Sequence, residues 1–546
     1  MTVKIIDIFA GPGGLGEGFS EFQDPVTEQK AFEVVLSVEK ERYAHQTLTL
    51  RSFYHEFRSG NVPADYYRVL RGDITTERLY EKWPEEAEKA MKKTWRAELG
   101  EGENAVSGEM VDKRIEEALN GSTEWILIGG PPCQAYSVAG RSRRRESMLD
   151  AAKDERVGLY KQYLRILALH SPPVFVMENV KGLLSAKTKE SPVFRSILRD
   201  LSDPVKAYMA EYGDSYSDPV CPGYRIYSMA AEPQYYDAGK APVFSQNDFI
   251  IYTERHGIPQ SRHRVILLGI RKDLDLEPGI LPEEGRVELG EVLKGLPELR
   301  SSLSKTKDSE KLWKSVLKQI LAPGILDETD EDVRKEIKHQ LKMIRGRSND
   351  TGAEFLPADN ISVGYRPDWF LDKQLKGVCN HAARAHMESD LLRYLFVACF
   401  GKKKKRSPKL VDFPSGLLPH HKNVQDGISG KAFDDRFRVQ LSDEPCKTIT
   451  SHIAKDGHYY IHPDPSQCRS FTVREAARVQ TFPDNYYFCG SRTAQFTQVG
   501  NAVPPLLANK IAGIVDNLFE NIRRRKNAGR KRNCFSKSIQ LTIRFN

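Results

Sequence analysis

Short, continuous apolar runs alternate with segments of helical periodicity through the first half of the chain. The runs are rich in β-branched residues and lack polar–apolar alternation, as expected for strands buried on both faces of a parallel sheet. They occupy residues 4–10, 33–39, 125–130, 173–179, 248–252 and 264–270. Between two of them, residues 157–170 carry apolar side chains at helical spacing and end before prolines. The pattern predicts an α/β fold with a doubly wound, mostly parallel, Rossmann-like sheet.

The alternation stops after about Lys272, and the chain is polar and irregular up to about Phe437. Strongly patterned segments return at residues 469–486 and 498–519, the second being a predicted helix opened by two prolines. We therefore predict a first domain over residues 1–274, a smaller irregular inserted domain over 275–437, and a return to the first domain over 438–546. This return ends in a helix and a basic tail. Two long charged stretches, 85–123 and 188–247, are interpreted as surface insertions that could add contacts to a partner.

The composition is that of a globular protein without a membrane segment. The 546 residues are 40% hydrophobic and 29% charged, enough for two or more domains with full cores. No signal peptide and no membrane-spanning run is recognisable, which predicts a cytoplasmic protein that does not contact membranes. The eight cysteines are scattered, with no CxxC pair. Reduced thiols are expected, without a structural metal.

The net charge of +8 is unevenly distributed, with basic clusters at residues 141–145, 402–406 and 523–532. Such clusters suit a polyanion, because each Lys or Arg that meets a phosphate releases counterions. Any one cluster is more often a solvated loop or tail, and the last is expected to be a tail. Charge alone therefore only suggests nucleic acid as a partner.

A glycine-rich motif follows the first predicted strand. Gly11, Gly13 and Gly16 form a GxGxxG pattern that permits a tight turn and a close approach of the backbone to a cofactor. Glu39 ends the next strand, where a carboxylate can bind ribose hydroxyls, and Asp73 is predicted to follow a further strand and accept a bond from an adenine amino group. The residues leave two cofactors open, a nicotinamide dinucleotide and S-adenosylmethionine.

Side chains of three chemical kinds are predicted to meet at one edge of the sheet. Cys133 follows two prolines after the strand that ends near Gly130, and Glu178 ends another strand. Arg262 and Arg264 begin a third. A lone cysteine is more often packed than reactive. A thiol converging with a carboxylic acid and a guanidinium instead indicates a covalent catalyst with its proton donor and anion clamp.

The ordered set of blocks resembles the cytosine-5 DNA methyltransferase family, particularly its bacterial restriction-modification members. The blocks run "DIFAGPGG", Glu39, Asp73, "GGPPCQAYS", "RVGLYKQYLRIL", "MENV", "QSRHR", "RSFTVREAARVQTFP" and "QVGNAVPP". They cover nearly all of the chain outside the inserted domain. The resemblance eliminates the dehydrogenase alternative and implies that the inserted domain reads a short DNA sequence.

The resemblance implies a role for each catalytic residue. Cys133 would add to carbon 6 of cytosine, Glu178 would supply a proton to the ring, and Arg264 would hold the exocyclic oxygen, with Arg262 supporting the same loop. The base must be flipped out of the duplex to be reached. Implied contacts to S-adenosylmethionine come from Phe9, Gly11, Gly13, Gly14, Leu15, Glu39, Asp73, Ile74, Pro132, Leu159 and Asn501. Implied DNA contacts come from Gln134, Ser137 and Arg141, on a loop that closes over DNA in this family.

Thr472, Arg474 and Glu475 are interpreted instead as a helix-start network that braces the inserted domain. The expected partner is double-stranded DNA, with a cognate restriction endonuclease as a functional partner, and a monomer is expected. Two alternatives stay open. A transfer-RNA cytosine-5 methyltransferase shares the active-site motifs, and an inactive regulatory relative would have lost a catalytic group, whereas Cys133, Glu178 and Arg264 are all present.

Overall fold

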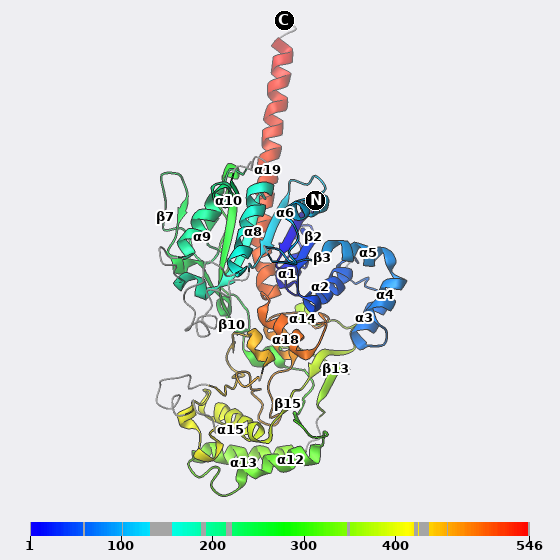
Figure 1. Ribbon diagram of the computed structural model, residues 1–546, viewed down its shortest axis with the longest axis vertical. Coiled ribbons are helices and arrows are strands. Elements are labelled where there is room, and N and C mark those ends of the chain that lie inside the picture. The colour runs from blue at the N-terminus through cyan, green and yellow to red at the C-terminus, as the bar shows by residue number, and fades with distance from the viewer. Residues whose placement is uncertain are drawn as a thin grey trace.

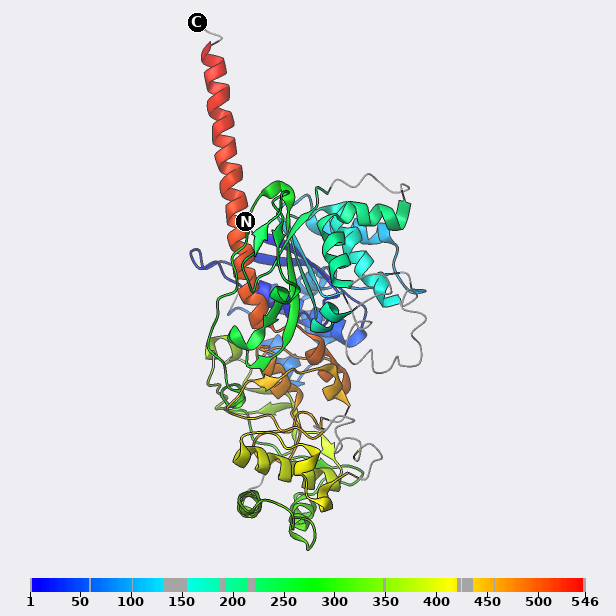
Figure 2. The same ribbon diagram turned by 90° about the vertical axis from the view of Figure 1, so that its left-hand side faces the viewer.

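A computed structural model gives the fold of the chain (Figures 1 and 2). It describes residues 2–57, 60–100, 102–131, 155–186, 193–213, 221–346, 350–419, 424, 436–455 and 457–543. The molecule is elongated in Figure 1, with the central sheet in its upper half and helices α12, α13 and α15 at its lower end. No helix within the described ranges is long and apolar enough to cross a membrane.

The central sheet contains the six predicted strands. Among the described residues its strands follow the order β3-β2-β1-β4-β5-β11-β6, and β9 pairs with β11 outside this path. The first five in this order are parallel, whereas β11 runs antiparallel to β5, β6 and β9. The strands are β3 (Thr94–Arg96), β2 (Phe32–Glu39), β1 (Val3–Ile8), β4 (Trp125–Gly129), β5 (Val174–Val180), β11 (His263–Arg271), β6 (Tyr224–Tyr227) and β9 (Ile250–Tyr252).

Helices cover both faces of this sheet, which confirms the doubly wound α/β prediction. Alternate residues of each strand point to opposite faces, so Ile5 packs in one core cluster and its neighbour Ile6 in another. Helices α1 (Gly14–Ser20) and α19 (Pro505–Ile543) cover the first face. Helices α6 (Gly108–Leu119), α8 (Glu155–His170) and α9 (Val193–Ser202) cover the second.

The interpretation of residues 85–123 and 188–247 as surface insertions is wrong. The first stretch supplies β3 and α6, and the second supplies α9, α10 (Pro204–Tyr212) and β6. Both strands extend the sheet, β3 beside β2 and β6 beside β11. A segment of three residues such as "TWR" is too short to produce a strand signal by its hydrophobic pattern.

The inserted part of the chain has its own helical core, which corrects the prediction of an irregular domain. Apolar side chains of α12 (Glu310–Lys318), α13 (Glu331–Gly346) and α15 (Glu388–Lys404) form this second core. Val439, Ile461 and Cys468 belong to the same cluster, so its packing continues beyond Phe437. The domain boundaries stay a prediction.

Smaller elements connect the sheet to the second core. A cluster around α11, α17 and α18 joins the two regions, and the antiparallel pair of β13 and β14 packs against α3 to α5. These elements are α2 (Arg42–His55), α3 (Ala64–Arg71), α4 (Thr76–Lys82), α5 (Pro84–Lys93), α11 (Leu289–Leu293), β12 (Ser302–Leu303), β13 (Gly352–Pro357), α14 (Pro367–Phe370), β14 (Gly377–Ala382), β15 (Ala385–His386), α17 (Val473–Val479) and α18 (Arg492–Asn501). Two further short strands, β10 (Gln260–Ser261) and β16 (Cys446–Lys447), pair in parallel.

The start of α19 lies directly on α1, although the two helices are far apart in the sequence. A Cβ atom added at Gly14 would lie 2.3 Å from the carbonyl oxygen of Val503. One added at Gly18 would lie 2.3 Å from the Pro505 oxygen and 2.4 Å from the Cβ of Ala508. Glycine therefore permits the close packing that closes one face of the sheet. Beyond this contact, α19 extends away from the body as a single helix rather than a loose tail (Figures 1 and 2).

We expect Gly18→Ala to lower the free energy of unfolding by about 1–3 kcal/mol, because the added methyl group overpacks the α1–α19 contact. Thermal unfolding followed by circular dichroism measures the change. Gly279→Ala is the matched control, since a Cβ atom there meets nothing within 4 Å. Equal melting temperatures for the two variants would contradict the packing argument.

Candidate active site

A cavity of about 310 Å³ lies at the carboxyl ends of the parallel strands. The strand order reverses between β1 and β4, and open α/β sheets bind their ligands at such a point. The lining of the cavity comes from β1, β2 and β5, from the segments that follow β1, β2, β3 and β4, from the start of α1, and from one residue each of α8 and α18. The lining includes Asp7, Phe9, Ala10, Gly11, Pro12, Gly14, Leu15, Val38, Glu39, Lys40, Ala97, Leu99, Gly130, Pro131, Leu159, Glu178, Asn179, Val180, Asn501, Ala502 and Val503.

The glycine-rich segment lines this cavity and contains a turn with several positive φ angles. Phe9, Gly11 and Gly13 all have positive φ angles, of 57°, 59° and 97°. Such angles cost little for glycine but are unfavourable for phenylalanine. The turn leads directly into α1, whose first residue is Gly14. A ligand in the cavity therefore meets exposed backbone and the amino end of a helix.

Glu39, the last residue of β2, braces this turn from the neighbouring strand. Its carboxylate accepts hydrogen bonds from the backbone N–H of Gly11 at 2.8 Å and of Glu41 at 2.7 Å. Burial raises the pKa of this carboxyl above its usual value of 4.5, although the two N–H donors oppose the shift. Glu39 thus combines a fixed position with an acceptor at the wall of the cavity.

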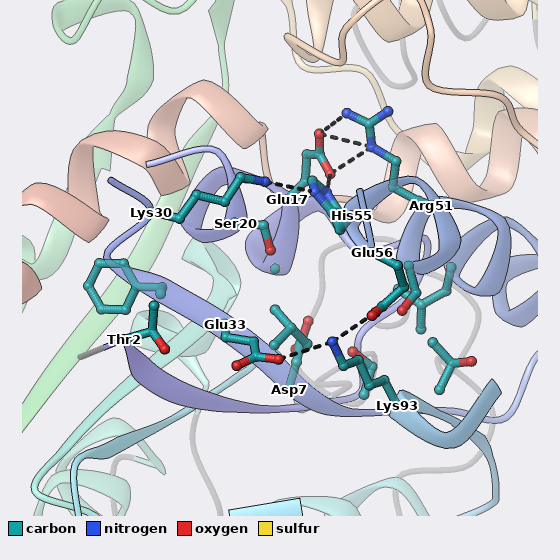
Figure 3. Close-up of a pocket in the computed structure, with 18 of the residues that line it drawn as sticks. Thr2, Asp7, Glu17, Ser20, Lys30, Glu33, Arg51, His55, Glu56 and Lys93 are labelled. Carbon is teal, nitrogen blue, oxygen red and sulfur yellow. Dashed lines mark hydrogen bonds and ion pairs between the residues drawn. The ribbon is translucent and has the colours of Figure 1, made fainter. Parts of the chain in front are cut away.

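Asp7 lines both this cavity and a second one of about 330 Å³, which is lined from α1, α2, β1 and β2 (Figure 3). Its side chain is fully buried. Burial and the nearby carboxylate of Glu39 raise its pKa well above the usual value, while the backbone N–H of Gly16 lowers it. Two acids at the ends of adjacent strands thus share one wall of the site.

Glu178 and Arg264 form an ion pair at the same edge. The Nε atom of Arg264 lies 2.8 Å from Oε1 of Glu178, and both side chains are mostly buried. The pairing follows from the antiparallel register, which places Arg264 opposite Val180, two residues along β5 from Glu178. A Cβ atom at Gly130 would lie 3.1 Å from Oε2 of Glu178, so the end of β4 also approaches this acid.

Arg262 does not reach the cavity. It is fully buried and donates from Nη1 to the carbonyl oxygens of Ile449 at 2.7 Å and Gly500 at 3.2 Å. Its role is therefore to hold the start of β11 against the returning part of the chain. Gln260 adds to this attachment by donating to Oε1 of Gln480 at 2.7 Å.

The structure brings most of the proposed cofactor residues together. Those that line the cavity are Phe9, Gly11, Gly14, Leu15, Glu39, Leu159 and Asn501, whereas Gly13 faces the second cavity. Pro132, Cys133, Gln134, Ser137 and Arg141 lie outside the described residues. The described chain reaches Pro131, which lines the cavity two residues before Cys133.

The prediction that Asp73 follows a strand is wrong. Asp73 follows helix α3, is half exposed, and pairs with Arg71 at 3.2 Å. Ile74 packs with the α2–α5 helices rather than at the cavity. The apolar run before Asp73 was too short to distinguish a strand from one buried face of a helix. Ala97 and Leu99, which follow the unpredicted strand β3, line the cavity instead.

Lys40 and Pro131 also line the cavity, and sequence reasoning missed both. Their positions in the sequence could have indicated them, because Lys40 directly follows Glu39 and Pro131 directly follows Gly130, the last residues of two predicted strands. The Nζ atom of Lys40 lies 3.1 Å from Oε1 of Glu98, in the segment that follows β3.

The interpretation of Thr472 and Glu475 as a helix-start network agrees with the structure. They form a reciprocal capping box at the start of α17, and Glu475 also pairs with Arg469 at 2.6 Å. Arg474 donates to the carbonyl oxygens of Cys379, Pro483 and Tyr486. Since Cys379 belongs to β14, the network connects the returning segment to the inserted part.

The basic cluster at residues 402–406 is paired with acidic side chains on the surface of the second helical region. Lys402 and Lys403 both pair with Glu336, and Lys404 pairs with Asp330. Lys405 pairs with Asp443 and Arg406 with Asp412. These pairs favour a structural role for the cluster over binding to a polyanion.

Nearly the whole chain is similar to known proteins. A family model described as C-5 cytosine-specific DNA methylase matches residues 80–205 and 249–516. Type II methyltransferase M.Bpa9945I of Bacillus paralicheniformis is 33% identical, over 94% of this chain and 99% of the relative. Type II methyltransferase M.DdeI of Desulfomicrobium norvegicum is 27% identical, over 95% and 90%. DNA (cytosine-5-)-methyltransferase M.ApeKI of Aeropyrum pernix is 24% identical, over 72% and 81%.

Proposed function

The chain belongs to the C-5 cytosine-specific DNA methylase family, and from this premise we propose its cofactor, its catalytic residues and its biological setting. It is a DNA (cytosine-5-)-methyltransferase. The observation that carries the proposal is the Glu178–Arg264 pair, in which Glu178 lines the strand-end cavity and Arg264 holds its carboxylate.

S-adenosylmethionine is the proposed occupant of this cavity. The glycine turn leaves room for a close ligand, Glu39 offers an acceptor for ribose hydroxyls, and Phe9 with Leu99 and Val38 offers apolar surface for adenine. A volume of about 310 Å³ is within the usual range for small-molecule sites. When bound, this cofactor supplies an electrophilic methyl group.

The ionised form of Glu39 is the better acceptor for ribose hydroxyls, so cofactor affinity should depend on pH. Because burial raises the pKa of Glu39 above 4.5, affinity is expected to be complete above that raised pKa and to fall as the pH drops through it. Glu39→Gln should weaken binding about 10- to 100-fold and flatten the pH profile, since hydrogen bonds to a charged group are the strong ones.

Isothermal titration calorimetry with S-adenosylmethionine between pH 5 and 8 measures both effects. Glu33→Gln is the matched control, because Glu33 lies on the same strand but pairs with Lys93 at 3.0 Å in the second cavity. Unchanged affinity in Glu39→Gln would contradict the assignment of Glu39.

The chemical steps are assigned to three side chains. The Cys133 thiolate adds to carbon 6 of a flipped cytosine and makes carbon 5 nucleophilic. Glu178 donates a proton to the ring nitrogen, and Arg264 holds the exocyclic oxygen while fixing Glu178. After carbon 5 has accepted the methyl group, it loses its proton to solvent, the double bond between carbons 5 and 6 re-forms, and the Cys133 thiolate leaves. The ring nitrogen then returns its proton to Glu178. Arg262 positions the start of β11.

The remaining proposals concern the substrate. Duplex DNA is expected to be read by the inserted part of the chain through the major groove, with Gln134, Ser137 and Arg141 contributing contacts. Relatives named as type II methyltransferases support a role in protecting DNA in a restriction-modification system, with a cognate endonuclease as its counterpart. They also favour DNA over transfer RNA as the substrate.

Transfer of a labelled methyl group from S-adenosylmethionine tests this function. Duplex plasmid DNA is expected to become labelled, and total transfer RNA is not. Label on transfer RNA alone would overturn the choice of substrate.

A further inference from the structure

A buried tyrosine is bonded to the cofactor turn from a part of the chain more than 470 residues away. Tyr486 follows α17 and is almost completely buried, at 1% exposure. Its hydroxyl donates a hydrogen bond to the carbonyl oxygen of Pro12. Pro12 stands between Gly11 and Gly13 in the turn and lines the strand-end cavity. A Cβ atom at Gly13 would lie 3.0 Å from the same hydroxyl oxygen. The hydroxyl is therefore in direct contact with the turn.

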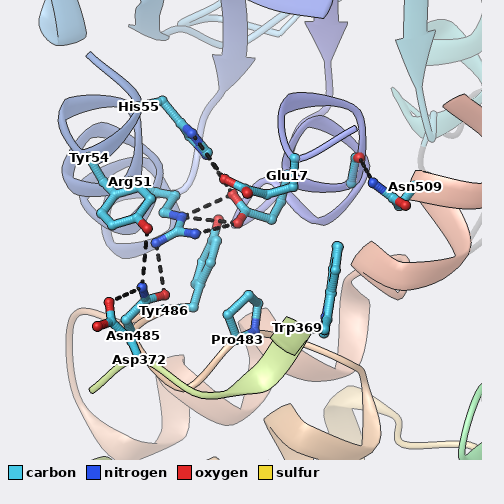
Figure 4. Close-up of polar contacts among 12 residues, drawn as sticks. Glu17, Arg51, Tyr54, His55, Trp369, Asp372, Pro483, Asn485, Tyr486 and Asn509 are labelled. Carbon is cyan, nitrogen blue, oxygen red and sulfur yellow. Dashed lines mark hydrogen bonds and ion pairs between the residues drawn. The ribbon is translucent and has the colours of Figure 1, made fainter. Parts of the chain in front are cut away.

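The tyrosine ring is itself held by a charged network (Figure 4). The guanidinium of Arg51, on α2, lies over the ring at 5.0 Å from its centroid. Arg51 pairs with Glu17 of α1 at 2.5 Å, and both side chains are buried. The Nη1 atom of Arg51 also donates to Oδ1 of Asn485, the neighbour of Tyr486, at 3.0 Å.

The network continues into the inserted part of the chain. Asn485 donates from Nδ2 to Oδ2 of Asp372 at 2.7 Å, and the hydroxyl of Tyr67 donates to the same oxygen at 2.6 Å. Asp372 follows α14. The contacts thus run from Asp372 through Asn485 to Tyr486 and the cofactor turn.

The charges in this network are strongly stabilised. Burial opposes ionisation of Glu17, but Arg51 and His55 beside it hold the pKa of Glu17 well below its usual value. Burial lowers the pKa of His55. Arg51 and Glu17 therefore stay charged, and the guanidinium remains fixed over the ring of Tyr486.

We propose that Tyr486 is a positioning residue for the cofactor: its hydroxyl sets the Pro12 carbonyl, and with it the turn that contacts S-adenosylmethionine. The turn needs such support, because the positive φ angle of Phe9 is costly for a residue with a side chain, and the flexible glycines Gly11 and Gly13 do not fix the backbone by themselves. This inference rests on the proposed function, since it assumes that S-adenosylmethionine occupies the strand-end cavity. The same network makes the cofactor site depend on the inserted part of the chain.

Tyr486→Phe removes the hydroxyl and keeps the ring. The Kd and the KM for S-adenosylmethionine are expected to rise about five- to tenfold, because the Pro12 carbonyl loses its buried donor. The kcat at saturating cofactor should match the parent, since Tyr486 does not line the strand-end cavity. Tyr224→Phe is the matched control, because that buried hydroxyl also donates to a backbone carbonyl, Pro172 at 2.9 Å, but at the far edge of the sheet.

A Tyr486→Phe enzyme with the KM of the parent would overturn the inference, as would a fall in kcat with an unchanged KM, which indicates general loss of folded protein. A parent that does not bind S-adenosylmethionine would overturn the cofactor proposal as well, so the two failures are distinguishable. Asn485→Ala provides a second variant if Tyr486→Phe does not fold. It breaks the link to Asp372 and should raise the KM by a smaller factor, and an unchanged KM there would contradict the network.

Discussion

Replacing Cys133 with serine is expected to abolish methyl transfer while leaving the binding of S-adenosylmethionine intact. A hydroxyl is a far weaker nucleophile than a thiolate at neutral pH, so the rate should fall at least about a thousandfold. Single-turnover methylation of plasmid DNA measures the rate, and calorimetry measures cofactor binding. Methylation by Cys133→Ser at the rate of the parent would contradict the covalent mechanism.

The buried cysteines of the described chain are poor candidates for the nucleophilic role that we propose for Cys133. Burial raises the pKa of Cys379 to about 12 and that of Cys489 to about 11, and it also raises the pKa of Cys399, Cys446 and Cys468. These thiols stay protonated at neutral pH and do not line the strand-end cavity. Cys221→Ser is the matched control, because this half-buried thiol precedes the edge strand β6. It should methylate like the parent.

Glu178→Gln is expected to lower kcat by about 10²- to 10⁴-fold, the usual contribution of a general acid. Glutamine preserves the shape of the side chain and can still accept a bond from Arg264, but it cannot donate a proton to the cytosine ring. The KM for S-adenosylmethionine should change little, because the catalytic effect arises after both substrates bind. Steady-state kinetics at saturating cofactor measure the difference.

A matched control removes an equivalent ion pair elsewhere. Glu124 pairs with Arg523 of α19 at 2.8 Å, the same distance as between Glu178 and Arg264, but this partly exposed pair does not border the strand-end cavity. Glu124→Gln should therefore leave kcat unchanged. Equal kinetics for the two variants would show that Glu178 acts only through packing and charge balance.

Apolar runs in the sequence were sufficient to predict most strands of the sheet but not its edge strands β3 and β6. Strands β1, β2, β4 and β5 are continuous apolar runs because helices cover both faces, and they coincide with the predicted segments. Strand β3 has three residues and β6 has four, too few to be distinguished from a loop by periodicity. The helices of the second core were missed because their charged faces dominate the composition, as in α13.

The sequence likewise placed some of the site residues correctly and misplaced others. Glu39 was predictable because it ends a buried strand, and the structure places it at the cavity, while its role stays a prediction. Asp73 was misplaced because the apolar residues before it form a helix face. The contact between Tyr486 and Pro12 joins residues 474 positions apart, so no local pattern in the sequence could reveal it.

Bisulfite sequencing of plasmid DNA from cells expressing the protein tests the central claim most directly. The parent should protect cytosines from conversion within one short sequence, and Cys133→Ser should protect none. Complete conversion with the parent, or equal protection by the parent and Cys133→Ser, would contradict the claim that this chain methylates carbon 5 of cytosine through Cys133.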